Sequence, residues 1–233
     1  MPTTPRERAR AQTLADITRI GRQHLAADGA AALSLRAVAR DLGVVSSAVY
    51  RYVNSRDELL TLLVVDAYNE LGDEVDTAVA AADEPSEKFL ALARSVRSWG
   101  LREPASYALL FGSPVPGYHA PAERTTVPGT RVIVALVRLF DEAWRDGMLT
   151  PEPVNVAGLQ EALHDDFTAI RDEMGTELPD EFLARGVLVW ASLFGAVSFD
   201  VFDQYGASTF SNRDALFEYQ LARLADIAGF GHR

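Results

Sequence analysis

The side chains whose types and spacing could do chemistry lie between Ser46 and Arg51. In this stretch Ser46, Ser47, Tyr50 and Arg51 fall on the polar face of a predicted helix, and all four can donate hydrogen bonds. A helix that reads DNA places small polar side chains and arginine near base edges and longer donors near phosphates. The pattern therefore indicates nucleic-acid recognition, with an ordinary helical hairpin and a solvated face as the alternative.

Two short predicted helices position these side chains. Ser34 stands at the N-cap of the first, where its hydroxyl can accept a backbone N–H, and Gly43 suits the left-handed residue that ends it. The first helix carries an apolar stripe at helical spacing: Leu35, Val38, Ala39 and Leu42. The second carries its own stripe: Val45, Ala48, Val49, Tyr52 and Val53. Two short helices joined by a turn that contains glycine describe a helix-turn-helix.

The distribution of charge supports a polyanionic partner for the N-terminal part. The chain of 233 residues has a net charge of −11. Residues 1–56 nevertheless hold nine arginines against four acidic residues, a local charge of +5, and residues 57–233 hold 13 basic and 29 acidic residues, or −16. Such asymmetry is typical of a nucleic-acid-binding segment joined to an acidic companion, which discourages nonspecific binding of DNA.

Composition excludes several other classes of protein. The absence of cysteine excludes disulfides and thiolate metal sites. No apolar run reaches the ~18 residues of a membrane span and the N-terminus lacks the apolar region of a signal peptide, so we expect a cytoplasmic chain with no membrane contact. Four scattered histidines and no Gly-rich phosphate loop offer no catalytic constellation, so we expect no enzyme activity and no cofactor.

The periodicity of the rest predicts an all-α chain in two domains, residues 1–56 and 57–233. A basic arm over residues 1–10 precedes a helix from Arg6 to Asp28 that ends at Gly29, with His24 packed in the core. Ser55 and Glu58 form a capping box that starts a long helix joining the two domains and running to about Ala82. Residues 112–129 hold four prolines and three glycines and predict a loop. Further helices are predicted over 86–103, 104–111, 129–146, 155–174, 179–205 and 213–228.

The predicted helix over 179–205 is apolar on all sides, so it must be buried on all sides. A homodimer would provide the second covering, and the heptad spacing on this helix nominates Leu183, Val187, Trp190, Phe194, Val197 and Val201 for the interface. The last predicted helix adds Leu216, Leu221 and Leu224 to the expected interface. The opposite side is also apolar, with Leu188, Ala191, Gly195, Phe199 and Phe202. Which of the two faces forms the interface stays open.

A small-molecule pocket is expected near the interrupted segment 112–129. Ligand sites are mostly apolar with a few polar anchors, and the candidates are Trp99, Tyr107, Phe111, Tyr118, His119, Trp144, His164 and Phe167. Glu161 and His164 form an E-x-x-H pair, which supplies two ligands in helical di-metal sites. Because such sites need a second copy and the sequence has none, we expect no metal.

The helix-turn-helix stretch resembles the DNA-binding segment of the TetR family of bacterial one-component regulators. LSLRAVARDLGV, followed by SSAVYRY and SRDELL, matches that family's pattern over about residues 11–63. The resemblance implies base contacts by Arg36, Ser46 and Ser47, and phosphate contacts by Tyr50, Tyr52 and Arg56. The expected DNA-binding set is Ser34, Arg36, Val45, Ser46, Ser47, Tyr50, Arg51, Tyr52 and Arg56. Val45 stands where Ser or Thr is usual and Ser46 replaces a common Lys, so relatives do not give the operator.

The resemblance implies a homodimeric, sequence-specific transcriptional regulator bound to a near-palindromic double-stranded operator. In the family the last two long helices form a four-helix bundle across a two-fold axis, and a small molecule releases the repressor from DNA. The resemblance therefore implies a small-molecule effector for this chain, whose identity the sequence does not give. The segment FGSPVPGYHAP is similar to a recurring loop of one subgroup but names no ligand. The alternatives are a regulator controlled by a protein partner and an all-helical enzyme with a vestigial helix-turn-helix.

Overall fold

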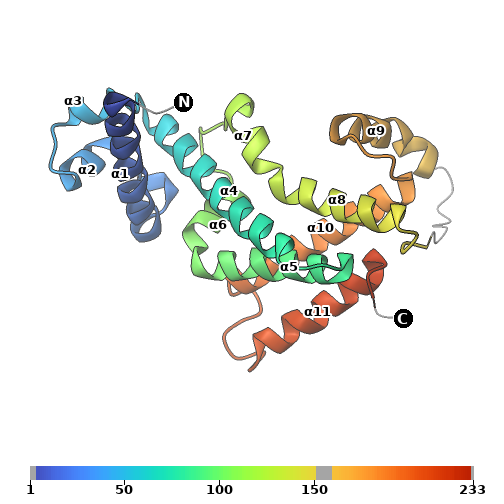
Figure 1. Ribbon diagram of the computed structural model, residues 1–233. Coiled ribbons are helices and arrows are strands. Elements are labelled where there is room, and N and C mark those ends of the chain that lie inside the picture. Colours follow the sequence, from blue (N-terminus) through green and yellow to red (C-terminus); the bar gives the residue numbers. More distant parts are fainter. Residues whose placement is uncertain (1–3, 151–158, 232–233) are drawn as a thin grey trace. The chain divides into compact units, whose positions relative to one another are not determined.

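The computed structural model describes residues 4–150 and 159–231, and every regular element in these ranges is a helix, as the sequence predicts (Figure 1). The described residues form two compact units. The first comprises residues up to Glu70 together with Glu103–Gly129, and the second comprises Leu71–Arg102 together with the residues from Thr130 onward. Helix α4 (Arg56–Ala80) contributes its beginning to the first unit and its remainder to the second.

The first unit is built around the helix-turn-helix. Its elements are α1 (Pro5–Asp28), η1 (Ala30–Ala32), α2 (Leu35–Asp41), α3 (Ser46–Val49), the start of α4, α6 (Pro104–Phe111) and α7 (Ala122–Gly129). One apolar core joins α1, α2, α3 and α4 through fully or nearly fully buried side chains: Ile17, Leu25, Leu35, Val38, Val49, Val53, Leu59 and Leu63. Figure 1 shows α1, α2 and α3 grouped in this unit.

The turn between α2 and α3 has the predicted form. Gly43 adopts a left-handed conformation, with φ of 70°, that costs glycine least. Two details of the prediction are wrong. Ser34 occupies the N-cap of α2, but its side chain makes no capping hydrogen bond. Val45 is not part of the inward stripe, because it is the N-cap of α3 and is 71% exposed.

Helix α1 begins earlier than the predicted basic arm allows. The side chain of Thr4 accepts the backbone N–H of Glu7, and the carboxylate of Glu7 accepts the N–H of Thr4 at 2.7 Å, so a capping box starts the helix at Pro5. Residues 5–10 are therefore helical. His24 is partly buried rather than packed in the core, and its Nε2 lies 2.6 Å from the carboxylate of Asp41 on α2.

The predicted domain boundary at residue 56 coincides with the start of α4, but the first compact unit extends beyond it. Leu59, Leu60 and Leu63 of α4 are buried in the same core as α1 and α2, which explains why the unit continues to Glu70. Ser55 caps α4 by accepting the N–H of Glu58, as predicted, whereas the carboxylate of Glu58 accepts the N–H of Asn54 instead of Ser55.

The segment predicted as a loop over 112–129 contains a helix. Helix α7 spans Ala122–Gly129 and starts where the N–H groups of Arg124 and Thr125 donate to the carbonyl of Pro121. A proline at a helix start removes no needed donor, and Glu123 in the first turn complements the helix dipole. The count of prolines and glycines hid this local signal, and the loop is confined to residues 112–121.

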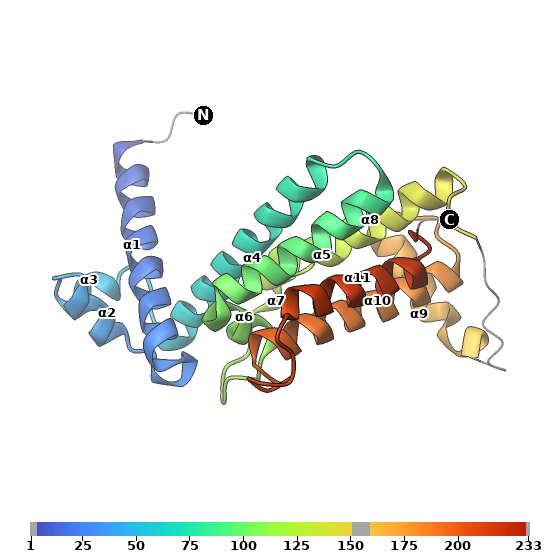
Figure 2. The ribbon, with the colours of Figure 1, turned by 90° about the horizontal axis from the view of Figure 1, so that it is seen from below.

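The second unit packs α10 against its neighbours. Its elements are the end of α4, α5 (Pro85–Arg102), α8 (Arg131–Arg145), α9 (Leu159–Met174), α10 (Asp180–Val201) and α11 (Arg213–Ala228). Helix α10 contacts α5, α8, α9 and α11, and Figure 2 shows α10 and α11 side by side. The ammonium of Lys88 on α5 lies 2.6 Å from the carboxylate of Glu142 on α8. The predicted start of α9 at residue 155 lies outside the described residues.

Helix α10 contradicts the expectation that no segment of the chain is long and apolar enough to span a membrane. By length and composition alone this helix could cross one, although only a third of its most apolar window is buried within the chain. A single such helix is weak support for a span, because core helices of water-soluble proteins pass the same test. The exposed apolar area of α10 calls for a partner surface.

Candidate nucleic-acid interface and effector site

Helix α3 and the turn that follows it present polar side chains outward, and the helix is shorter than predicted because it ends at Val49 and leaves Tyr50 and Arg51 in the turn. Ser47 and Arg51 are exposed, Tyr50 is 41% exposed and Ser46 is half-buried, while Val49 on the opposite side is buried in the core. Arg36 on α2 is exposed as well. Arg40 and Arg56 pair with Asp41 and Asp57, whereas Arg36 and Arg51 form no ion pair with any described residue. Their charges therefore remain available to an external anion.

The two remaining predicted phosphate-binding residues make contacts within the first unit. Tyr52 is half-buried, and the guanidinium carbon of Arg10 lies 5.3 Å from the centre of its ring. Arg56 donates from Nη2 to the carbonyl oxygens of Ala30 and Ala31, at 2.9 and 3.3 Å. These bonds hold η1 against the start of α4. The sequence analysis predicted neither the contact of Tyr52 with Arg10 nor the bonds of Arg56 to η1. The position of Arg56 at the N-terminus of α4 was the available signal that its side chain could bond to a neighbouring segment.

An ion cluster fixes α1 against α4. The guanidinium of Arg22 contacts the carboxylates of Asp66, Glu70 and Glu103, at 3.3, 2.7 and 2.8 Å. Burial raises the pKa of Asp66, and the charge of Arg22 opposes that rise. One cation thus balances three carboxylates from α4 and the residue that caps α6. The cluster therefore holds together α1 and α4, which share one apolar core with the helix-turn-helix.

Several residues predicted for a dimer interface are buried in the chain's own core. Leu183, Val197, Leu221 and Leu224 are at most 7% exposed, so their assignment to an interface is wrong because no surface of theirs is left to bury. Val187 and Trp190 are 48% and 38% exposed, and Phe194, Val201 and Leu216 are half-buried. The exposed apolar face of α10 is the opposite one, formed by Ala184, Leu188, Ala191, Gly195, Phe199 and Phe202.

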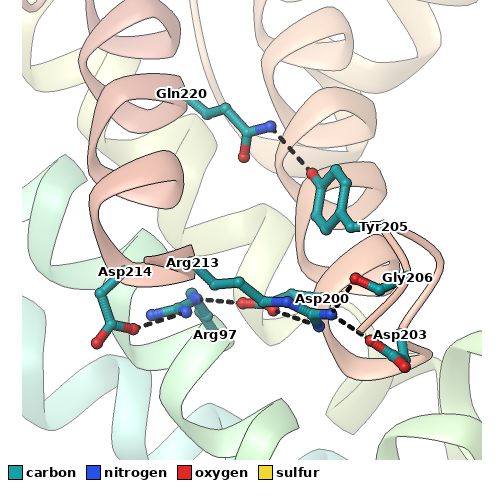
Figure 3. Close-up of polar contacts among 8 residues, drawn as sticks. All are labelled: Arg97, Asp200, Asp203, Tyr205, Gly206, Arg213, Asp214 and Gln220. Atoms are coloured by element: carbon teal, nitrogen blue, oxygen red, sulfur yellow. Dashed lines mark hydrogen bonds and ion pairs between the residues drawn. The ribbon is translucent and has the colours of Figure 1, made fainter. Parts of the chain in front are cut away.

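A polar network holds the turn between α10 and α11 (Figure 3). The buried carboxylate of Asp200 accepts a hydrogen bond from Nε of Arg97 at 2.7 Å, and Arg97 also pairs with Asp214 on α11 at 2.8 Å. Arg213 bonds to Asp203 and donates to the carbonyl of Gly206 at 3.0 Å. The network links α5, α10 and α11, so it fixes the C-terminal end of α10, the helix that carries the exposed face, against its two neighbours.

The eight residues predicted to line a ligand pocket are divided between the two units. Tyr107, Phe111, Tyr118 and His119 lie in the first unit, and Trp99, Trp144, His164 and Phe167 lie in the second. Trp99 and Tyr107 are fully buried, and the hydroxyl of Tyr118 lies 3.0 Å from that of Thr61 on α4. His119 is exposed. Neither unit brings the predicted set together.

An apolar cavity of about 240 Å³ lies instead between α8, α9 and α10 in the second unit. No residue of the predicted set lines it. Its walls are Ile133, Leu136, Val137, Phe140, Ile170, Met174, Leu178, Phe182, Leu183, Gly186, Val187 and Trp190. Sequence reasoning could have found one signal, since Gly186 interrupts the apolar side of α10 between Leu183 and Trp190.

The Glu161–His164 pair does not combine with a third ligand. His164 is exposed, and its Nδ1 lies 3.0 Å from the carboxylate of Asp180 at the start of α10. Arg171 pairs with the same carboxylate. Burial raises the pKa of Asp180, but the hydrogen bonds from Arg171 and His164 lower it by more, so it lies below its ordinary value. The described residues contain no cluster of three His, Cys, Asp or Glu side chains that could hold a metal.

Comparison with known proteins places this architecture in a family. Residues 89–224 match the family model described as tetracyclin repressor-like, C-terminal domain. The chain is 47% identical, over 95% of its length and 94% of theirs, to the HTH-type transcriptional regulators Mb1846 of Mycobacterium bovis and Rv1816 of Mycobacterium tuberculosis. The crystal structure of SCO4313, described as a regulatory protein, superposes with a TM-score of 0.76 at 31% identity, covering 96% of this chain and all of that one.

A helix-turn-helix with an outward polar recognition face, followed by an all-helical companion unit, defines a one-component transcriptional regulator. The chain belongs to the TetR family. The relatives named here are transcriptional regulators of the helix-turn-helix type and the solved structure is that of a regulatory protein, so the alternative of an all-helical enzyme is set aside.

Proposed function

We propose that the protein is a homodimeric cytoplasmic repressor that binds a near-palindromic operator and is released by a small-molecule effector. The observation that carries the proposal is the outward surface formed by α3 and the turn after it, where Ser47 on the helix and Tyr50 and Arg51 in the turn are exposed while Val49 is buried in the core. A rigidly held helix with donors near its N-terminus suits entry into the major groove of DNA.

The contacts of the helix-turn-helix divide into two kinds. We assign base reading to Arg36, Ser46 and Ser47, and phosphate contacts to Tyr50, Arg51 and Tyr52. Arg56 acts indirectly, because its guanidinium is bonded to the carbonyls of Ala30 and Ala31. Ser34 and Val45, at the N-caps of α2 and α3, set the helix starts at the DNA surface.

Dimerisation follows from the exposed apolar face of α10. Small residues at Ala191 and Gly195 allow a second α10 to approach closely, and a Cβ at Gly195 would meet nothing within 4 Å in the same chain. Two copies related by a two-fold axis present two α3 helices to successive half-sites of a palindrome. The polar network at the α10–α11 turn supports this surface.

Release by an effector requires that the effector bind the DNA-incompetent arrangement more tightly than the DNA-bound one. A tenfold loss of DNA affinity needs a coupling free energy of about 1.4 kcal/mol. A regulator controlled by a protein partner is the competing function. The two functions are distinguished by titration with small apolar molecules. A molecule that changes the tryptophan fluorescence and releases the protein from DNA would support control by an effector rather than by a protein partner.

The experiment is fluorescence anisotropy with DNA fragments that flank the protein's own gene, repeated over a salt series. We expect tight binding to one fragment that weakens steeply with salt, because phosphate contacts release counterions. Arg51→Ala should weaken that binding at least about tenfold, whereas Arg138→Ala, an exposed arginine of α8, should leave it unchanged. Equal binding to all fragments, with no effect of Arg51→Ala, would contradict the proposed DNA surface.

A further inference from the structure

We propose that the cavity between α8, α9 and α10 is the effector site and that it accepts an uncharged, hydrophobic small molecule. The inference rests on the proposed control by a ligand and adds the place and the chemical class of that ligand. It replaces the set of pocket residues expected from the sequence, none of which lines this cavity.

The cavity has a rigid floor and an accessible rim. Leu136, Phe140, Leu178 and Phe182 are at most 1% exposed and form its floor, within the packed core of the second unit. Val187 and Trp190 of α10 are 48% and 38% exposed and line its rim. A molecule can therefore enter from solvent and come to rest against side chains whose positions are fixed by packing.

The lining determines the class of ligand. All twelve lining residues are apolar, and the indole of Trp190 is the single group among them that can form a side-chain hydrogen bond. Two polar side chains of α9, Arg171 and His164, are both bonded to the carboxylate of Asp180 at the start of α10. A charged molecule entering here would lose its hydration and gain no partner, so an uncharged one is favoured.

The volume sets the size. A dry apolar cavity of about 150 Å³ is large enough to hold benzene. The cavity here is about 240 Å³ and partly open, so it suits a molecule with two linked aromatic ring systems, part of which extends through the opening, or an aliphatic chain of moderate length. Met174 on α9 adds an unbranched, flexible side chain to the wall, which adapts to ligands of different shape.

Gly186 distinguishes this cavity from a packing defect. Glycine lowers the stability of a helix interior relative to alanine, yet α10 has glycine where it borders the cavity. A Cβ at this position would meet only the ring of Phe140, at 3.9 Å, so a larger side chain would be accommodated by the backbone and would occupy the cavity. The absence of a side chain at Gly186 is what keeps the space open.

The test uses two fluorescent probes that differ by one sulfonate. N-phenyl-1-naphthylamine is uncharged, and 1-anilinonaphthalene-8-sulfonate is the same molecule with an anionic group. With the full-length wild-type protein we expect saturable binding of the uncharged probe, one per chain, with quenching of tryptophan emission because Trp190 lies at the rim. The sulfonate should bind at least about tenfold more weakly. Equal affinities would overturn the assignment of ligand class.

Two cavity variants and one control locate the site. Gly186→Leu should reduce affinity for the uncharged probe at least about tenfold by filling the cavity, and Gly186→Ala, which adds one methyl group, should reduce it less. Ala169→Leu adds the same bulk to an exposed position of α9 and should leave affinity unchanged. Circular dichroism establishes that each variant is folded. Unchanged binding by both folded Gly186 variants would overturn the proposed site.

A separate measurement distinguishes failure of the site from failure of the proposed function. Probe binding is read without DNA, so it decides whether the cavity is a ligand site. Operator binding is then measured by anisotropy with and without saturating uncharged probe. Release of the operator by the probe in the wild type, and its loss in Gly186→Leu, supports both proposals. Binding in the cavity without any change in operator affinity would retain the ligand site and contradict its role as the effector site.

Discussion

Arg56 illustrates how the first unit uses an arginine of the proposed DNA-binding set for its own stability. Its guanidinium donates to two carbonyl oxygens of η1. We expect Arg56→Ala to lower the free energy of unfolding by about 1–2 kcal/mol, the usual contribution of hydrogen bonds from a charged donor. Urea unfolding measures this loss. Arg51→Ala, which removes an exposed arginine without an ion pair to any described residue, should change stability by less than about 0.5 kcal/mol.

The opposite pattern would contradict this division. If Arg56→Ala left stability unchanged and weakened DNA binding as much as Arg51→Ala, then Arg56 would contact phosphate directly and its bonds to Ala30 and Ala31 would be incidental.

The contact between His24 and Asp41 makes stability depend on pH. Hydrogen bonds from His24 and then from Arg40 lower the pKa of the Asp41 carboxyl below its ordinary value. A depressed carboxyl pKa contributes stability that is present above the unfolded value, near 3.9, and is lost as pH falls through the folded value. We therefore expect Asp41→Asn to be less stable than the wild type at pH 6 and to differ less from it at pH 3.

Urea unfolding of both proteins over this pH range gives the difference directly. A difference that stays constant from pH 6 to pH 3 would show that Asp41 contributes through packing rather than through its charge.

Among the elements, α1 and α4 depend on one cation. Arg22 contacts Asp66, Glu70 and Glu103 and is largely shielded from solvent. Replacing it leaves three carboxylates close together without a cation, which is the costly way to break a cluster. We expect Arg22→Met to lower the free energy of unfolding by about 2 kcal/mol or more. Arg19→Met removes an exposed arginine on the same helix and should cost less than about 0.5 kcal/mol.

This prediction is measured by chemical unfolding followed through circular dichroism. Equal effects of Arg22→Met and Arg19→Met would mean that the cluster is a surface arrangement with no net contribution to the attachment of α1.

The exposed face of α10 gives a prediction about assembly. Gly195→Glu places a carboxylate among Ala191, Phe199 and Leu188, where a second copy would bury it without a partner. We expect the dimer dissociation constant to rise at least about a hundredfold, equivalent to about 3 kcal/mol. Light scattering after gel filtration measures the change in mass. Ala169→Glu on the exposed side of α9 adds the same charge and should leave the assembly intact, and a dimeric Gly195→Glu protein would exclude this face.

Local signals in the sequence predicted most elements, and long-range packing decided what they did not predict. Gly43 and the spacing of Leu35, Val38 and Ala39 identified the helix-turn-helix, because its caps and buried stripe are fixed within a few residues. Helix α7 was missed because the four prolines of residues 112–129 concealed a helix start at Pro121. The cavity could not be predicted, since it depends on how three successive helices, α8, α9 and α10, pack around the space left by Gly186, and the periodicity of each helix alone does not give that packing.

Long-range packing also accounts for the error over the dimer surface. The heptad spacing of α10 identifies an apolar seam, but it does not say whether that seam faces the chain's own core or a second copy. Leu183 and Val197 face the core because α5, α8 and α11 pack there. Only the positions of those helices show that the opposite face is the exposed one.

At the scale of the whole molecule, the two-fold symmetry of the proposed dimer predicts the form of the operator. Two α3 helices in such a dimer would engage half-sites whose centres lie one helical turn of DNA, about 34–36 Å, or a multiple of it apart. We expect insertion of about five base pairs between the half-sites, roughly half a turn, to weaken binding at least about tenfold by rotating one half-site to the opposite side of the duplex. Anisotropy with the two duplexes measures the difference, and a full-turn insertion is the control. Unchanged affinity would indicate that a single helix-turn-helix is sufficient for binding.

The single lysine of this chain, Lys88, which pairs with Glu142, limits which modifications and crosslinking chemistries can act on this regulator. Lys88 is the single lysine of the chain, and it is held at 2.6 Å from a carboxylate in the second unit. The basic surface around α3 consists of arginines, so acetylation of lysine side chains has no target there. Formaldehyde, which couples proteins to DNA chiefly through primary amines, will capture this regulator poorly. Genome-wide mapping of its operators therefore calls for a chemistry that reacts with arginine or tyrosine, or for footprinting in place of crosslinking.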